Sequence, residues 1–425
     1  MIRMLTDKNN GNFFRLWLGQ LVSQFGDRIT QLALVGLAAE KMHGAASATG
    51  LAKLMAFTIL PVFLIQPIAG VLVDRWDRRT TLFVCDIVRS LLILSIPFIF
   101  MRWHTMLPIY GVIFLTFCFS RFYVPAKMSI IPDLVEDDNL LAANSLVSTT
   151  GMIAFVLGCA VGGVLIEWFG ARTGFIIDAA TFFISGVMIY SITVRRDLVK
   201  TQQEFWVTGK ELVGKIKVGF WEDLRDGIKY LMTHKEIRFI IDMLFAILFM
   251  AGSVYVVIIV FIQQSFGSVT KHLGGLAVCL GAGLFLGALA YGKWGKKLVW
   301  YKTIFASFIS AGIMLIIFAY LVKLYPNVWL AGALASLLGL FIGPIFIATN
   351  TVAQVVSDEK MRGKVFSALE IVIHLAFLLS MLLSSWASKY VGTQHILITA
   401  GSITCLIGVV GLFRGEFKAK ERMIQ

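Results

Sequence analysis

Long apolar stretches separated by short polar segments dominate the chain. Each stretch has 18–29 residues, and an α-helix needs about twenty to cross a bilayer. Two sets of these stretches flank one long polar segment, 195–238. The first set covers 13–39, 48–73, 80–101, 107–124, 141–169 and 174–194, and the second covers 239–263, 273–293, 303–322, 328–352, 363–388 and 395–413. The pattern therefore predicts twelve transmembrane helices.

The composition excludes an ordinary water-soluble protein. Of the 425 residues, 58% are hydrophobic and 15% are charged, and the mean hydropathy is +0.82. Soluble domains carry roughly 25% charged residues. Residues 1–12 are polar and lack the short apolar core of a secretory signal peptide, so we expect the first stretch to stay as a span. The predicted fold class is an all-α membrane protein.

Positive charge is distributed between the spans in a way that predicts orientation. The chain has 38 Lys and Arg residues and a formal net charge of +13. If both termini are cytoplasmic, most of these residues lie in cytoplasmic segments, as the positive-inside rule requires. A nucleic-acid-binding surface would instead cluster them on a soluble domain. We expect a multi-pass protein with both termini cytoplasmic and no nucleic-acid partner.

The two sets of spans repeat one another. The second span ends in Gly70–Asp74 before a basic turn, and the eighth ends in Gly287–Tyr291 before another. Acidic segments at 135–138 and 356–359 precede the fifth and eleventh spans. These two segments are separated along the chain by nearly the same number of residues as Gly70 and Gly287. Parallel repeats of this kind enclose a cavity near the bilayer midplane. The predicted domains are a six-helix half at 1–194, a linker at 195–238, and a second six-helix half with a basic tail at 239–425.

The linker contains an amphipathic pattern at 221–231. Trp221, Leu224, Ile228 and Leu231 recur every three or four residues, and charged residues fill the other face. This pattern predicts a helix on the membrane surface. It serves either as a structural strap between the halves or as a regulatory docking site.

The basic turn after the second span resembles the signature of the major facilitator superfamily. The matching residues are Gly70, Asp74, Arg75, Arg78 and Arg79. Asp77 departs from the pattern, because the family usually has glycine there. The resemblance implies a major facilitator fold without a cofactor, in which Asp74 holds the start of the eleventh span and Arg121 completes a cytoplasmic gate.

A second motif lies in the fifth span. Gly158, Gly162 and Gly163 resemble the glycine-rich motif of the antiporter branch of this superfamily. Cys159 stands where that motif has proline, which weakens the antiporter inference. We expect these glycines to pack helices closely.

Shorter stretches resemble two groups within the superfamily. Segments 13–20, 177–180 and 361–366 are similar to the macrolide-efflux and enterobactin-exporter group, whereas 123–127 and 141–144 are similar to the lysophospholipid transporters. The first resemblance implies a monomeric proton-coupled exporter of amphipathic small molecules in the bacterial inner membrane. The second implies a lysophospholipid flippase there. The sequence leaves both open.

Charged residues inside the first span are candidates for binding a proton or substrate. Asp27 lies at mid-span, with Gln20, Gln24 and Gln31 at helical or near-helical spacing. Charges at mid-membrane are costly unless they are paired or face water. Asp27 therefore serves proton or substrate binding, or pairs with its neighbour Arg28 or with another helix.

The second half offers its own polar pairs. Glu370 and His374 are four residues apart in the eleventh span, so they share a helix face, and imidazole can carry a proton near neutral pH. Asn350 and Gln354 have the same spacing at the end of the tenth span. The alternative for these pairs is a polar contact that holds helices together.

Other polar groups have structural interpretations. Asp86 and Arg89, three apart, can pair with each other, and Asp178 is expected near the outer end of the sixth span as a packing residue. An enzyme is disfavoured, because we find no metal-ligand spacing. The segment 287–293 imitates a phosphate-binding loop, but Trp294 replaces the required Ser or Thr.

Overall fold

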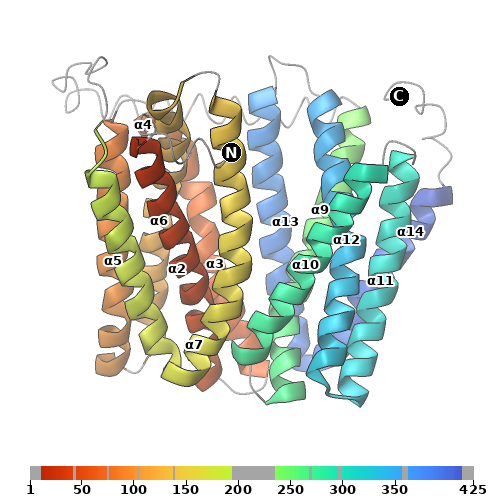
Figure 1. The fold of residues 1–425 in the computed structure, drawn as a ribbon. Coiled ribbons are helices and arrows are strands. Elements are labelled where there is room, and N and C mark those ends of the chain that lie inside the picture. The colour runs from red at the N-terminus through yellow and green to blue at the C-terminus, as the bar shows by residue number, and fades with distance from the viewer. Residues whose placement is uncertain are drawn as a thin grey trace. The chain divides into compact units, whose positions relative to one another are not determined.

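The computed structural model describes residues 11–41, 45–73, 76–103, 105–136, 139–193, 235–267, 270–294, 299–356 and 362–413. Regular structure in these ranges is entirely helical (Figure 1). The amphipathic segment predicted at 221–231 lies outside them. The helices are α2 (Gly11–Lys41), α3 (Ala45–Leu64), α4 (Gln66–Val73), α5 (Arg78–Trp103), α6 (Leu107–Leu134), α7 (Leu140–Tyr190), α9 (Lys235–Phe266), α10 (Thr270–Trp294), α11 (Trp300–Leu324), α12 (Val328–Val356), α13 (Arg362–Val391) and α14 (Thr393–Phe413).

Large apolar side chains cover the outside of these helices. Leu91, Phe98, Phe183 and Leu406 are each more than half exposed. A soluble monomer rarely exposes apolar patches of that extent. Within the described ranges, nine helices are long and apolar enough to cross a membrane. The apolar surface therefore faces lipid, as the hydropathy pattern predicts.

The described residues form two compact units. One is drawn from 1–37 and 54–223, and the other from 38–53 and 224–425. In the first unit, α5 packs against α6 and α7, and α4 packs against α6. In the second, α10 packs against α12, α11 against α12 and α14, and α9 against α13.

Helix α7 contains two legs that run in opposite directions, which Figure 1 shows as a sharp turn. The turn lies at Gly170, whose φ of 81° and ψ of 161° are readily adopted by glycine alone. The first leg, 140–169, and the second leg, 171–190, correspond to the fifth and sixth predicted spans. Both legs pack against α2, because Gly162 lies against Ile29 and Gly174 lies against Ala33.

The second predicted span, 48–73, is broken into α3 and α4. Pro67 has no amide hydrogen, so the carbonyl of Phe63 cannot receive the helical hydrogen bond from that position. The chain turns at Ile65, whose amide donates to the carbonyl of Pro61 at 2.9 Å. The hydropathy pattern missed this break because both helices are apolar.

Asp77, the departure from the family signature, caps α5. Its Oδ2 accepts a hydrogen bond from the amide of Thr80 at 2.7 Å. Such a cap satisfies one of the free amides at a helix start. The cap on α5 therefore accounts for aspartate at position 77, where the family usually has glycine.

We expect Asp77→Ala to destabilise the protein by about 1 kcal/mol, and Asp77→Gly by only a few tenths of that, since glycine is itself tolerated at this position. Thermal unfolding of the detergent-purified variants measures the difference. Equal melting temperatures for the two variants would show that the cap contributes nothing.

In the second unit, α10 and α12 meet backbone to backbone. A methyl group built on Gly283 would lie 1.9 Å from the carbonyl oxygen of Ser336, and one on Gly287 would lie 2.2 Å from that of Leu340. Small residues allow such close approach of membrane helices. Gly287 and Lys293 both lie inside α10, so the segment that imitates a phosphate-binding loop is helical.

Candidate functional site

A small cavity with polar walls lies inside the first unit. Its volume of about 30 Å³ is enough for one or two water molecules. Helices α2, α3, α5, α6 and α7 all contribute to its wall. The lining residues are Asp27, Thr30, Gln31, Leu34, Met55, Thr58, Ile93, Thr116, Phe117, Ser120, Asp178 and Phe182.

Two carboxylates from different helices meet at this cavity. Asp178 is fully buried, and its Oδ1 accepts a hydrogen bond from the Thr181 hydroxyl at 3.0 Å. Its Oδ2 makes no hydrogen bond within the described part of the chain. A methyl group on Gly26 would lie 2.2 Å from Asp178 Oδ1. Gly26 therefore lets the Asp178 carboxylate approach α2, where Asp27 is the next residue.

The sequence predicted a role for Asp27 but gave Asp178 only a packing role near the outer end of its span. Asp178 lies roughly two helical turns beyond Gly170, inside the second leg of α7. Its neighbours are the cavity and α2. Its pairing with Asp27 depends on the packing of two spans that are distant in sequence, so no local pattern signals it.

The polar stripe predicted on α2 is divided between two faces. Asp27 and Gln31 line the cavity, whereas Gln24 lies against Gly151 of α7. The Arg28 guanidinium donates to Gln31 Oε1 at 2.8 Å and lies 4.9 Å from the centre of the Phe155 ring. Among the described residues, no ion pair joins Asp27 to Arg28.

A buried ion pair lies on α5, as the three-residue spacing predicts. Arg89 pairs with Asp86, and the Ser185 hydroxyl donates to Asp86 Oδ2 at 2.7 Å. The Arg89 guanidinium lies between two rings, 4.4 Å from the centre of Tyr123 and 4.3 Å from that of Phe182. The pair therefore ties α5 to α6 and α7.

We expect Asp86→Asn to destabilise the protein by about 3–5 kcal/mol, because it leaves the Arg89 charge buried without its counter-ion. The double variant Asp86→Leu/Arg89→Met removes both charges and should be markedly more stable than Asp86→Asn. Melting temperatures in one detergent compare the two. If the double variant is the less stable, the hydrogen bonds of the pair outweigh the cost of the buried charge.

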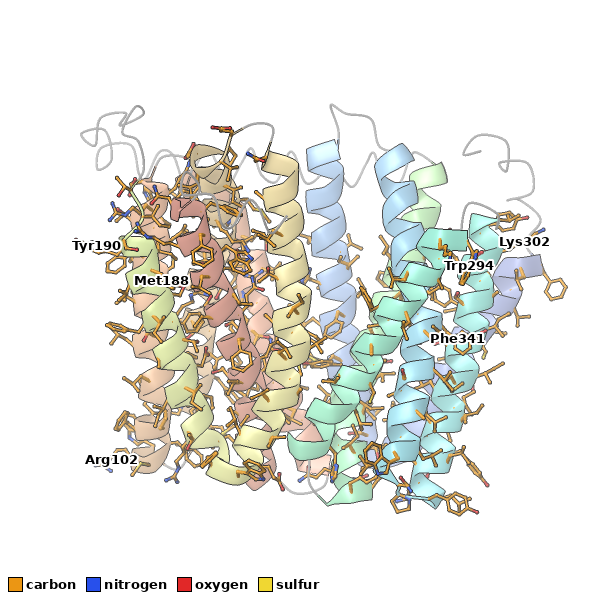
Figure 2. The ribbon with its side chains drawn as sticks, in the orientation of Figure 1. Arg102, Met188, Tyr190, Trp294, Lys302 and Phe341 are labelled. Carbon is orange, nitrogen blue, oxygen red and sulfur yellow. The ribbon has the colours of Figure 1, made fainter. Side chains whose placement is uncertain are left out.

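Arginines of the signature fasten the start of α5 to other helix ends. Arg78 donates to Asp133 Oδ2 at 2.6 Å and to the carbonyl of Ser129 at 2.8 Å, both on α6. Arg79 donates to the carbonyl of Tyr190 at the end of α7. Figure 2 shows Tyr190 at one end of this unit. Arg102, in the last turn of α5, lies at the opposite end.

The remaining gate residues are only partly described. Gly70 lies on α4, while Asp74 and Arg75 lie outside the described residues. Nη1 of Arg121 lies 3.5 Å from Gln66 Oε1, which links α6 to the start of α4. A contact between Arg121 and Asp74 stays a prediction.

The other candidates lie on α7, α12 and α13. Gly158 and Gly162 lie against Arg28 and Ile29 of α2, and Gly163 is buried on the same leg. His374 is half-buried on α13. The side chains of Asn350, Gln354 and Glu370 lie outside the described residues.

A helical chain with apolar outer faces and buried carboxylates around a small cavity is characteristic of multi-pass membrane transporters. The model of the Major Facilitator Superfamily matches residues 16–354 and, in a second match, residues 241–422. The chain belongs to the major facilitator superfamily. The family membership expected from the signature after the second span is thereby confirmed.

Relatives match over nearly the whole chain. An uncharacterized MFS-type transporter of Bacillus subtilis, YfiS, is 26% identical, and the match covers 98% of this chain and 96% of that protein. Macrolide efflux protein A of Streptococcus pyogenes is 25% identical over 94% of each chain. The crystal structure of a bacterial homologue of the iron transporter ferroportin, in an inward-facing state, superposes with a TM-score of 0.68 at 15% identity, covering 95% of this chain and 99% of that one. This last likeness concerns the fold alone.

Proposed function

We propose that this protein exports an amphipathic small molecule from the bacterial cytoplasm by alternating access, driven by proton entry. Membership of the superfamily establishes a transporter, and the match to a macrolide efflux protein supports the export direction and the substrate type. The protein acts as a monomer in the inner membrane.

The observation that carries proton coupling is the meeting of Asp27 and Asp178 at one cavity. Two carboxylates close together in a medium of low dielectric constant repel each other when both are charged. When one carboxylate binds a proton, this repulsion is relieved. When the proton is released, the carboxylate is charged again and is more stable in contact with water. The pair can therefore sense whether the cavity is open to water or closed.

The proposal places this pair within twelve transmembrane helices. The halves are 1–194 and 239–425, the linker is 195–238, and both termini are cytoplasmic. Asp74 and Arg121 close the cytoplasmic side in one state of the cycle. Asn350, Gln354, Glu370 and His374 supply polar groups for substrate or protons from the second half, as Gln24 and Arg28 do from the first.

Reconstituted liposomes test the function. We expect radiolabelled erythromycin, a macrolide, to move faster when a pH gradient is imposed, and a fluorescent lysophospholipid to move no faster than in protein-free liposomes. Lysophospholipid movement that ignores the gradient, with no movement of erythromycin, would contradict the proposal and leave a lysophospholipid flippase as the function.

A further inference from the structure

The cavity of the first unit presents oxygen lone pairs to its interior. The hydroxyl of Thr58 donates its hydrogen to the carbonyl of Met55 at 2.7 Å. The hydroxyl of Thr116 donates to the carbonyl of Val112 at 2.9 Å, and the hydroxyl of Ser120 donates to the backbone carbonyl of Thr116 at 3.1 Å. Since each hydroxyl has only one hydrogen, these three groups can only accept from, or coordinate, whatever occupies the cavity.

Two buried oxygens at the same cavity make no hydrogen bond within the part of the chain that the structure describes. Asp178 has no exposed surface, and its Oδ2 makes no hydrogen bond to any described residue. The Thr30 hydroxyl, 6% exposed, lies beside the Asp178 carboxylate and likewise makes no hydrogen bond within the described ranges. Buried polar atoms in native proteins are nearly always satisfied. An occupant of the cavity that coordinates or donates to Asp178 Oδ2 would satisfy this acceptor.

The charge of the cavity wall has the same sign throughout. Asp27 and Asp178 are its ionisable lining residues. Basic groups on the surrounding helices, namely Arg28 on α2, Arg89 on α5, and Arg121 and Lys127 on α6, influence Asp27 from outside the lining. Of these, Arg28 donates to Gln31 and Arg89 pairs with Asp86. An anion would meet two carboxylates, with the Thr30 hydroxyl and the Gln31 amide as the donors among the described lining residues that have a hydrogen to give.

The donor set selects a hard cation. The described lining residues supply carboxylate, hydroxyl and amide oxygens and include no Cys or His. Oxygen ligands suit alkali and alkaline-earth ions, whereas soft transition metals prefer sulfur and nitrogen. Magnesium keeps several waters, for which a cavity of about 30 Å³ has too little room. If one carboxylate of the pair carries the coupling proton, a single negative charge is left for the ion.

We propose that this cavity binds one sodium ion, coordinated by Asp178, by Asp27, and by the hydroxyl oxygens of Thr30, Thr58, Thr116 and Ser120. The choice of an ion with a single charge rests on the proposed function. That function places a proton on one carboxylate of the Asp27–Asp178 pair, which leaves one negative charge for the ion. Sodium and proton then share the cavity, so that sodium acts as a second coupling ion of the transporter.

Binding of ²²Na⁺ to the full-length protein in detergent at pH 8 tests the site directly, with potassium chloride holding the ionic strength constant. We expect saturable binding of one ion per chain. Asp178→Asn should weaken it by about ten- to hundredfold, at least the loss seen when supporting groups of metal sites are removed. Thr116→Val, which removes a neutral ligand, should weaken it less.

Thr404→Val is the matched control. The Thr404 hydroxyl on α14 donates to the carbonyl of Ala400 at 2.7 Å, in the same way as Thr116, but lies outside the cavity lining. This variant should bind ²²Na⁺ like the wild type. Size-exclusion profiles identify any variant that fails to fold. If Asp178→Asn fails to fold, Thr116→Val alone tests the site.

Three results would overturn the sodium site. They are the absence of saturable ²²Na⁺ binding, equal binding by wild type and both cavity variants, and displacement of ²²Na⁺ by potassium or calcium more readily than by unlabelled sodium. Gradient-driven erythromycin transport without ²²Na⁺ binding overturns this inference and leaves the proposed function standing. Binding of ²²Na⁺ without transport supports the site and removes the proposed function.

Discussion

Asparagine at position 27 or 178 is expected to abolish transport of erythromycin driven by a pH gradient while leaving exchange of erythromycin across the membrane intact. Asparagine keeps the size of the side chain but cannot gain and lose a proton. Exchange needs only that the binding site opens alternately to the two sides of the membrane. This alternation continues when the asparagine variant can no longer bind and release the coupling proton. A defect confined to gradient-driven transport is the signature of lost coupling.

Liposomes loaded with erythromycin measure both processes. Uptake of labelled erythromycin against unlabelled drug, with equal pH on both sides, reports exchange, and uptake with a pH gradient alone reports coupled transport. Glu167→Gln is the control, since Glu167 is an exposed carboxylate on α7 outside the cavity lining. It should retain both activities.

Two results would contradict the assignment of Asp27 and Asp178 as the coupling site. Coupled transport that survives in both asparagine variants moves the coupling site elsewhere, with Glu370 and His374 next in order. Loss of exchange together with coupling assigns Asp27 and Asp178 to packing or to substrate binding.

Adding one methyl group at Gly283 should destabilise the second unit strongly. The new methyl would lie 1.9 Å from the carbonyl oxygen of Ser336 and 3.0 Å from the amide nitrogen of Leu340. Both atoms belong to the backbone of α12, so only a shift of a whole helix relieves the contact. Overpacking of this kind costs about 1–3 kcal/mol or more, and we expect a clear fall in melting temperature for Gly283→Ala.

Gly275→Ala is the matched control on the same helix. A methyl group there meets no atom within 4 Å, and alanine favours a helix over glycine by about 1 kcal/mol. Gly275→Ala should therefore be as stable as the wild type or more so. If both variants melt alike, α10 and α12 are not in the close contact described.

The fold could largely be predicted because lipid imposes a simple rule on sequence. A span must be apolar over about twenty residues, since the backbone can satisfy its hydrogen bonds only within the helix. The break before Pro67 and the turn at Gly170 are backbone events within or between apolar stretches. Hydropathy does not register the first and places the second only within a few residues.

The candidate site could be predicted only in part. Asp27 is conspicuous as a charge at the middle of a span. Asp178 stands in a span with no other charge, and its partnership with Asp27 arises because Gly26 and the second leg of α7 pack together. Arg28, adjacent in sequence, turns instead toward Gln31 and Phe155. Contacts between distant spans decide which charges meet, and spacing within one span does not reveal them.

Proton movement that accompanies the substrate tests the central claim most directly. Liposomes containing the protein and a pH-sensitive dye are given an erythromycin gradient, with equal pH on both sides at the start. We predict that the wild type moves protons against the flow of erythromycin and that Asp178→Asn moves none while still exchanging the drug. Equal proton movement in the two proteins, or erythromycin flow without protons in the wild type, would contradict the assignment of the Asp27–Asp178 pair as the proton-coupling site.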